Sequence, residues 1–449
     1  MAEINKSKGN DYYGRSSIGR ILFNIAPPVM LAQLIQALYN VVDSFFVGKY
    51  SNDGLTALSA VYPAQLVMIA LAVGTGVGVN TYMARKYACG QDKDADKTAG
   101  TGTVLSLISW TLFALLSYFV MEPYIRTSAT AENAIKYGVT YGKIVCVGSI
   151  GVFLEGNWSK IHQARGNMRR PMIAQIAGAV TNIILDPVLI FGYGPFPEMG
   201  VAGAAIATVL GQILSALIVS FGAIHKPPEI KEIFHFIKKI YYYGYSSIFM
   251  QLLYTVYILA LNIILAGFSD AGVIVLGLYY KLQSFFFIPL FGLQTCIVPV
   301  LSYNYTAKKY DRCKKTMTYS FGISALFMTV GMICFIFFPE QMIHIFSKSE
   351  EVTEIGKTAF PIIGACFLPA VFSLIMPTYF QAIGKGITSA FLSLLRQVIC
   401  LIPIFKLFSL LGLNYTWIAF PVSETIAGTV GLILYFRENK KFAKSCDNA

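Results

Sequence analysis

Two aspartates inside long apolar stretches are the residues best suited to chemistry in this sequence. Asp43 lies late in the first stretch, and Asp186 lies within the fifth, four residues after Asn182. A charged side chain at the centre of a bilayer costs at least about 2.5–3.5 kcal/mol, so each carboxylate requires a reason to be there. Residues four apart share one helix face, so Asn182 and Asp186 can direct oxygen atoms at the same volume.

The groups around these carboxylates are oxygen donors. Pro187 has no N–H, so it leaves the carbonyl oxygen of Ile183 without its helical partner beside Asp186. Oxygen ligands suit a hard cation or a proton rather than a soft metal. We therefore expect a transported coupling ion, H+ or Na+, with no cofactor and no metal other than Na+. The expected cation-coupling residues are Asp43, Asn182, Asp186, Thr208 and Asn157. The alternative is that each carboxylate only bonds one helix to another.

A second group of residues is aromatic or carries an amide, and most of it lies in the C-terminal half. Such faces suit flat amphipathic cations, through ring stacking and cation–π attraction. The alternative for each residue is an ordinary helix interface or a membrane belt. The expected substrate cavity comprises Tyr39, Asn40, Tyr62, Met68, Gln251, Tyr254, Tyr257, Asn262, Tyr279, Gln283 and Phe287.

The elements that must position these residues are apolar and long. Hydrophobic residues make up 55% of the 449 positions and charged residues only 13%, about half of what a soluble domain carries. The sequence predicts an all-α integral membrane protein with twelve transmembrane helices in two pseudo-symmetric six-helix lobes. The apolar spans lie near 20–47, 55–80, 99–121, 137–159, 171–192, 201–224, 239–266, 272–299, 316–339, 355–380, 387–411 and 415–436.

Basic residues mark the orientation of the chain. Lys and Arg cluster in alternate loops, which places both termini in the cytoplasm of a multi-pass plasma (inner) membrane protein. This topology accounts for the net charge of +12 without a nucleic-acid partner. The expected parts are an N-terminal segment (1–20), an N-lobe (21–224), an inter-lobe loop (225–238), a C-lobe (239–436) and a tail (437–449).

The two halves echo each other, but only the first carries the carboxylates. Ala84-Arg85-Lys86-Tyr87 resembles Ala307-Lys308-Lys309-Tyr310, and the repeated order of six spans indicates a parallel repeat. The repeat pairs Asp43 with Asn262, Asn182 with Cys400 and Asp186 with Ile404. We therefore expect a cation site in the N-lobe alone.

Several motifs make the chain resemble the multidrug and toxic compound extrusion (MATE) family along essentially its whole length. The resemblance implies a twelve-helix antiporter that exports cationic drugs against a proton or sodium gradient by alternating access. It points to the branch with an N-lobe cation site, because Gln251 and Asn262 stand in the seventh span, where the other branch has an acid. The motifs are Tyr39-Asn40-x-x-Asp43, Ala60-Val-Tyr62-Pro63, Gln163-Ala164-x-Gly166-Asn167, Asn182-x-x-x-Asp186-Pro187 and Gly200-x-x-Gly203-Ala204-Ala205-x-Ala207-Thr208.

Two functions follow as hypotheses. The first is cation-coupled efflux of amphipathic, mostly cationic drugs or toxic compounds by a monomer in the lipid bilayer. The alternative is a flippase for a lipid-linked saccharide, which would favour a cavity ringed by Arg and Lys. An enzyme is not expected, because the sequence has no Gly-rich nucleotide loop and no nucleophile with its base. The roles of Glu155, Lys281 and Glu424 stay open.

Overall fold

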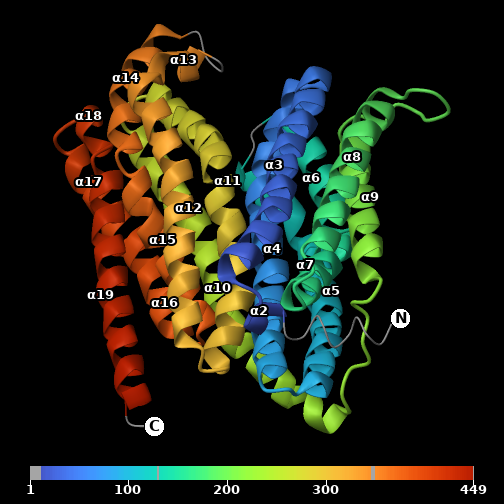
Figure 1. Cartoon of the computed structure of the whole chain (residues 1–449). Coiled ribbons are helices and arrows are strands. Elements are labelled where there is room, and N and C mark those ends of the chain that lie inside the picture. The colour runs from blue at the N-terminus through green and yellow to red at the C-terminus, as the bar shows by residue number, and fades with distance from the viewer. Residues whose placement is uncertain (1–11, 129–130, 345–348, 448–449) are drawn as a thin grey trace. The chain divides into compact units, whose positions relative to one another are not determined.

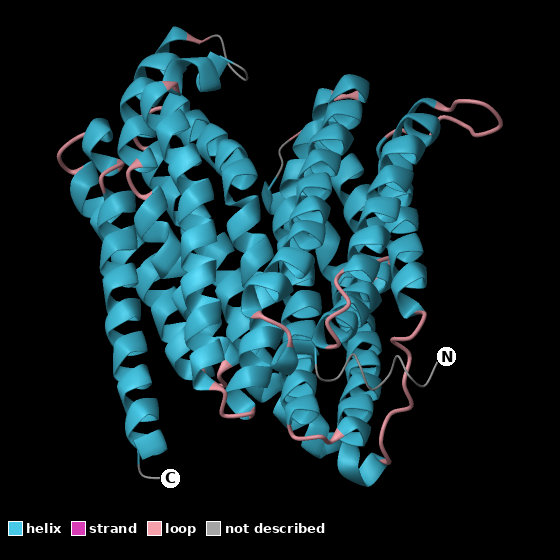
Figure 2. Ribbon diagram, in the orientation of Figure 1, coloured by secondary structure: helices cyan, strands magenta, loops and turns pink. Residues whose placement is uncertain are grey.

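A computed structural model describes residues 12–128, 131–344 and 349–447, and the side chains at 40, 41, 52, 128, 270 and 441–447 are not described. The described chain is built from helices joined by short loops (Figure 2). In the first half the helices are α2 (Tyr12–Arg15), α3 (Ile18–Tyr50), α4 (Asn52–Ala88), α5 (Asp92–Ser128), α6 (Glu132–Val147), α7 (Ile150–Ala164), α8 (Arg169–Phe191) and α9 (Val201–Ser220). In the second half they are α10 (Ile230–Ala266), α11 (Asp270–Thr306), α12 (Tyr310–Phe337), α13 (Pro339–His344), α14 (Glu350–Gly364), α15 (Phe367–Ala382), α16 (Gly386–Leu394), a π-helix η1 (Leu395–Leu401), α17 (Ile402–Ser409), α18 (Leu413–Thr416) and α19 (Ala419–Asp447).

The expected membrane spans are confirmed. Within the described residues, ten helices are long and apolar enough to cross a membrane, and the count reaches twelve if each of two bent helix pairs is one span. Helices satisfy their backbone hydrogen bonds internally, which a hydrocarbon surrounding demands. The all-α fold and the expected span positions therefore agree with the structure.

The two bent pairs were not predicted, because the sequence analysis treated each as one straight span. The pair α6 and α7 bends by 41°, and the pair α14 and α15 bends by 55° (Figure 1). The first break lies at Gly148 and Ser149 and the second at Ala365 and Cys366. Both breaks fall in the fourth span of their half, so the internal repeat extends to the shape of the helices.

The chain divides into two compact units. The first unit contains the described residues up to Ser16 together with Phe23–Gln251, and the second contains Ser17–Leu22 and the residues from Leu252 onward. The division falls inside α10, while the lobe boundaries predicted from the sequence stay a prediction. Helix α3 thus contributes its first residues to one unit and the rest to the other.

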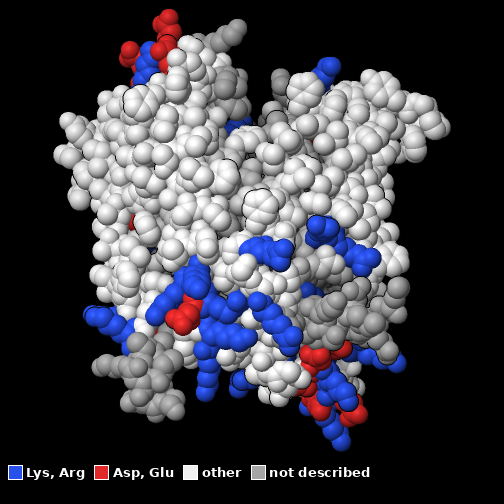
Figure 3. Space-filling view, viewed as in Figure 1, with Lys and Arg blue, Asp and Glu red and all other residues white. Residues whose placement is uncertain are grey.

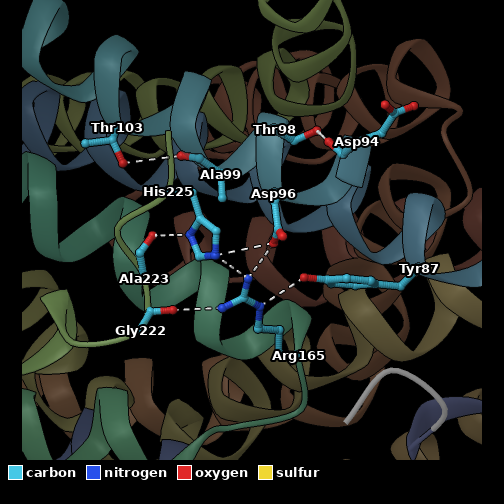
Figure 4. A network of polar contacts seen from close by, with 10 residues as sticks. All are labelled: Tyr87, Asp94, Asp96, Thr98, Ala99, Thr103, Arg165, Gly222, Ala223 and His225. Atoms are coloured by element: carbon cyan, nitrogen blue, oxygen red, sulfur yellow. Dashed lines mark hydrogen bonds and ion pairs between the residues drawn. The ribbon is translucent and has the colours of Figure 1, made fainter. Parts of the chain in front are cut away.

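Charged loops of the first unit meet at one end. Arg165, directly after α7, donates to the Tyr87 hydroxyl (2.9 Å), an Asp96 carboxylate oxygen (2.8 Å) and the Gly222 carbonyl (2.7 Å) (Figure 4). Its guanidinium also lies 2.7 Å from Nε2 of His225. These contacts join the ends of α4, α5, α7 and the segment after α9, which we call the basic end of the N-lobe. In the view of Figure 3 most Lys and Arg side chains lie in the lower half, and wide surfaces above them carry no charge.

The C-lobe has an aromatic interior. Phe335 lies at its centre, with its ring 4.8 Å from that of Phe367, 5.0 Å from that of Phe360 and 6.0 Å from that of Tyr279. All four side chains are buried, and the contact of Phe335 with Tyr279 is edge-on while the other two are tilted. Aromatic pairs of these geometries stabilise a core beyond their buried area. The interior therefore holds α11, α12, α14 and α15 together.

A buried ion pair crosses the same lobe. Arg396 lies in η1, and its guanidinium Nη2 is 2.8 Å from a carboxylate oxygen of Glu424 in α19. The side chains are only 11% and 7% exposed, and the Ser373 hydroxyl also donates to Glu424. A charged pair at this depth needs such complete pairing, because each ion has lost its water. Glu424 therefore links α15, η1 and α19.

Replacing Glu424 with Gln is expected to destabilise the protein by about 3–5 kcal/mol, because it leaves the buried Arg396 charge without a counter-ion. The measurement is the midpoint of thermal unfolding in detergent. A double variant, Arg396→Met with Glu424→Gln, should recover most of the loss. A double variant no more stable than the single one would contradict this account of the pair.

Candidate cation-coupling site

Helices α8 and α9 bring three of the predicted residues together. Nδ2 of Asn182 donates to Oδ1 of Asp186 (3.2 Å) and to the Thr208 hydroxyl oxygen (3.3 Å). The exposed fractions are 2% for Asn182, 0% for Asp186 and 2% for Thr208. The spacing of four residues on α8 therefore does place Asn182 beside Asp186, and α9 supplies the hydroxyl.

Helix α3 adds the second carboxylate. Asp43 is 7% exposed and interacts electrostatically with Asp186. Tyr39, one turn before Asp43, interacts electrostatically with both carboxylates. The far end of α3 is held against α8 by ring contacts of Phe46 and Tyr50 with Phe191 (6.5 and 6.3 Å). Two segments more than a hundred residues apart thus form one acidic group.

Three oxygens of this group have no hydrogen-bond partner in the described structure. They are Oδ1 of Asp43, Oδ1 of Asn182 and Oδ2 of Asp186, and all three are buried. Buried polar atoms are rarely left unpaired, and two neighbouring carboxylates repel each other unless a cation neutralises them. Carboxylate and amide oxygens are ligands for a hard cation or acceptors for a proton. The residues present therefore fit H+ or Na+.

The close approach of α8 and α9 depends on glycine. A Cβ at Gly178 would lie 2.0 Å from the Ser215 Oγ and 2.6 Å from the Gly211 carbonyl oxygen. A Cβ at Gly211 would in turn lie 2.6 Å from the Gly178 carbonyl oxygen. Gly178 stands one turn before Asn182, so this contact sets the distance from Asn182 to Thr208. Helix α8 then ends at Gly192, whose φ of 74° favours glycine.

Asn157 is placed differently from the other four. Its side chain is fully buried, and both its amide atoms lack a hydrogen-bond partner in the described structure. Its oxygen lies against α5, because a Cβ at Gly102 would be only 2.6 Å from the Asn157 Oδ1. A role for Asn157 in cation coupling stays a prediction.

Two residues near the acidic group were missed. Tyr141 of α6 is 2% exposed, and its side chain interacts with those of Thr208 and Gln65 and electrostatically with Asp43. Neither residue stands in a motif, and a tyrosine in an apolar span is usually interpreted as part of an interface. Only the fold places the Tyr141 hydroxyl next to Thr208.

The residues predicted for a substrate cavity differ in exposure. Tyr62 is 54% exposed, and Gln251 is exposed as well, while Tyr39, Tyr254, Asn262 and Gln283 are half-buried. The side chain of Asn40 lies outside the described residues. The remaining four are buried within their own lobe in this conformation: Met68, Tyr257, Tyr279 and Phe287. Their part in a cavity stays a prediction.

The structure shows the contacts of Glu155 and Glu424 and the exposure of Lys281, whose roles the sequence left open. Glu155 of α7 accepts hydrogen bonds from the Ser159 hydroxyl (2.6 Å) and from Nε2 of Gln175 on α8 (3.3 Å). Glu424 is the counter-ion of Arg396, and Lys281 is exposed. Glu155 therefore bonds α7 to α8, and Glu424 holds the C-lobe together.

A family model described as MatE matches residues 28–188 and matches again over residues 246–405. The chain belongs to the MatE family. The two matches begin 218 residues apart, which agrees with the repeat seen in the sequence. MatE proteins are membrane transporters rather than enzymes, so the family expected from the motifs is confirmed.

Curated relatives and solved structures agree with this MatE assignment along the whole chain. A FAD transporter of Shewanella oneidensis is 24% identical over 421 residues, 92% of this chain and 93% of the relative. Multidrug export protein MepA of Staphylococcus saprophyticus is 22% identical, over 95% of each chain. A transporter of the MOP superfamily from Pyrococcus furiosus superposes with a TM-score of 0.90 at 22% identity, over 97% of this chain and 99% of that one. The structural match confirms the two-lobe, twelve-helix fold.

Gly178→Ala is expected to destabilise the protein by about 1–3 kcal/mol, because the added methyl group must push α8 away from the α9 backbone. Gly322→Ala is the matched control, since a Cβ there meets no atom within 4 Å and alanine favours a helix. Thermal unfolding of both variants in detergent measures the difference. Equal midpoints would show that the glycine contact does not set the α8–α9 distance.

Proposed function

We propose that this MatE transporter exports amphipathic, mostly cationic drugs or toxic compounds in exchange for H+ or Na+. The observation that supports it most is the set of three buried, unpaired oxygens on Asp43, Asn182 and Asp186. Relatives named as a multidrug export protein and as a FAD transporter support a small-molecule cargo. The identity of the coupling ion is part of the proposal.

The proposed cycle uses repulsion between the two carboxylates. A cation from outside binds between Asp43 and Asp186 and cancels their mutual repulsion, so it stabilises the packing of α3 against α8. Departure of the cation restores the repulsion and favours another position of α3. The ion acts by binding one conformation more tightly than the other, as any coupled transport requires.

Helix α3 is suited to transmit this change. It contains Pro27 and Pro28, which interrupt its hydrogen bonds, and Asp43 lies four turns further along. Its first residues, Ser17–Leu22, belong to the second compact unit, whereas its remainder belongs to the first. A change at Asp43 can therefore alter the bend of α3 at the prolines and so the access to bound cargo.

A flippase for a lipid-linked saccharide is less well supported. It would need free cations within the spans to hold phosphate. Among the described residues, Arg396 is committed to Glu424, and the Lys143 Nζ lies 5.0 Å above the Tyr118 ring. Lys281 and Lys406 are exposed on different helices. No ring of cations emerges from these positions.

The basic ends of the lobes are proposed to face the cytoplasm of the plasma membrane, with both termini on that side. The support is the clustering of Lys and Arg in alternate loops, which the positive-inside rule assigns to the cytoplasm. We further propose that one monomer is sufficient for transport, because the acidic group comes from a single chain.

Asp43→Asn and Asp186→Asn are each expected to slow gradient-driven efflux of a cationic dye by at least about tenfold, because a lost charged ligand weakens cation binding by roughly that factor. The measurement is dye efflux from proteoliposomes under an imposed Na+ or H+ gradient. Whichever gradient drives efflux in the wild type identifies the coupling ion.

The matched control is Glu122→Gln, which also removes one carboxylate but from an exposed pair with Arg126. This variant should transport at the wild-type rate. Wild-type efflux by both aspartate variants would exclude the proposed coupling site. Wild-type protein that is folded but drives no efflux under either gradient would exclude antiport and favour the flippase.

A further inference from the structure

A cleft lies at the basic end of the N-lobe, where α8 begins and α9 ends. It has a volume of about 460 Å³ and is lined by Asn167, Arg169, Arg170, Ile173, Ile218 and Phe221. Arg170 is fixed across it, because its guanidinium donates to the Phe221 carbonyl oxygen. Within this lining two side chains are cationic and none is acidic. We call it the N-cleft.

A second cleft lies in the C-lobe, between the start of α16 and the last turns of α19. We call this the basic end of the C-lobe, because Lys385, Arg437 and Lys440 gather there. It has a volume of about 500 Å³, and its lining includes Phe380, Lys385, Leu434, Arg437, Glu438 and Lys440. Glu438 is 6% exposed and is paired with Lys385, whereas Arg437 and Lys440 are exposed. This C-cleft therefore also presents two cations beyond its internal ion pair.

The two clefts occupy the same place in the internal repeat. The family matches begin 218 residues apart, and that shift takes Asn167 of the N-cleft to Lys385 of the C-cleft and Arg170 to Thr388. Helices α8 and α16 begin the fifth span of each half, and α9 and α19 form the sixth. The two clefts therefore lie at equivalent positions of the internal repeat, and different basic residues line each of them.

The chemistry of both clefts combines cations with apolar walls at the end of a membrane span. Ile173 and Phe221 of the N-cleft are 53% and 68% exposed, which is costly in water and favourable against acyl chains. Arg and Lys beside them suit a phosphate, which arginine can bind through two hydrogen bonds. A free phosphate ion would gain nothing from the apolar walls, whereas a phospholipid at the membrane surface would contact both.

We propose that the N-cleft and the C-cleft each bind the headgroup of an anionic phospholipid from the leaflet at the basic end. Arg169 and Arg170 hold the phosphate in the N-cleft, and Arg437 and Lys440 hold it in the C-cleft. The acyl chains lie along Ile173 and Phe221 in the first and along Leu434 in the second. Basic pockets between membrane helices favour such lipids over neutral ones. Neither cleft includes any of the proposed cation-coupling residues in its lining.

The test is native mass spectrometry of the full chain released from nanodiscs that contain phosphatidylglycerol and phosphatidylcholine. The wild type should retain phosphatidylglycerol in preference to phosphatidylcholine, with up to two tightly held molecules. Arg169→Gln should lose one of them, and Arg169→Gln combined with Arg437→Gln and Lys440→Gln should lose both. These positions are exposed, so the variants should fold, and the thermal unfolding midpoint without lipid checks that they do.

The matched control is Lys314→Gln with Lys315→Gln, which removes two exposed charges at the basic end but outside both clefts. It should retain phosphatidylglycerol as the wild type does. Equal loss in this control would show that only general charge attraction holds the lipid and would overturn the proposal, as would unchanged retention in the triple variant. Inorganic phosphate added at millimolar concentration should not displace the lipid, and displacement would assign the clefts to a soluble anion.

Discussion

The amide of Asn182 is the interaction on which the candidate coupling site depends. Asp186 in its charged form can only accept hydrogen bonds, so the Asn182 nitrogen must face it, and the same nitrogen reaches the Thr208 hydroxyl. The Asn182 oxygen is thereby turned away from both partners. A single amide thus links α8 to α9 across the short spacing that Gly178 and Gly211 allow, and it leaves one buried oxygen of Asn182 without a hydrogen-bond partner beside Asp186.

The two lobes handle buried charge in opposite ways. The N-lobe brings two carboxylates together without a cationic side chain among their described hydrogen-bond and ion-pair partners, and this is the basis for proposing that an ion from outside the chain neutralises them. The C-lobe matches Glu424 to Arg396 and adds the Ser373 hydroxyl, so its charge is already balanced. Only the first arrangement lacks a counter-ion among its described partners, which is why we propose that coupling belongs to the N-lobe.

Much of this could be predicted from the sequence. Long apolar runs with few charges define the spans, because hydrocarbon admits little else, and the spacing of Asn182 and Asp186 defines their common face. The bends within the fourth and tenth spans could not be predicted, since Gly148 and Ala365 break no hydropathy pattern. Tyr141 was missed because its approach to Thr208 arises from packing between helices, and Gln65 was missed because it approaches Tyr141 in the same way. The Arg396–Glu424 pair joins residues whose separation in sequence gave no hint of contact.

The bends in the fourth span of each half bear on how the two halves evolved. They fall at corresponding positions, although Gly148 and Ser149 stand at one and Ala365 and Cys366 at the other. Two bends with unlike residues are most simply explained by one ancestral six-helix unit that was already bent before its gene was duplicated. Asp43 and Asp186, by contrast, correspond to Asn262 and Ile404 in the sequence repeat, so the two carboxylates distinguish the first half from the second. On this account the bend in the fourth span is older than the difference in buried carboxylates between the two halves.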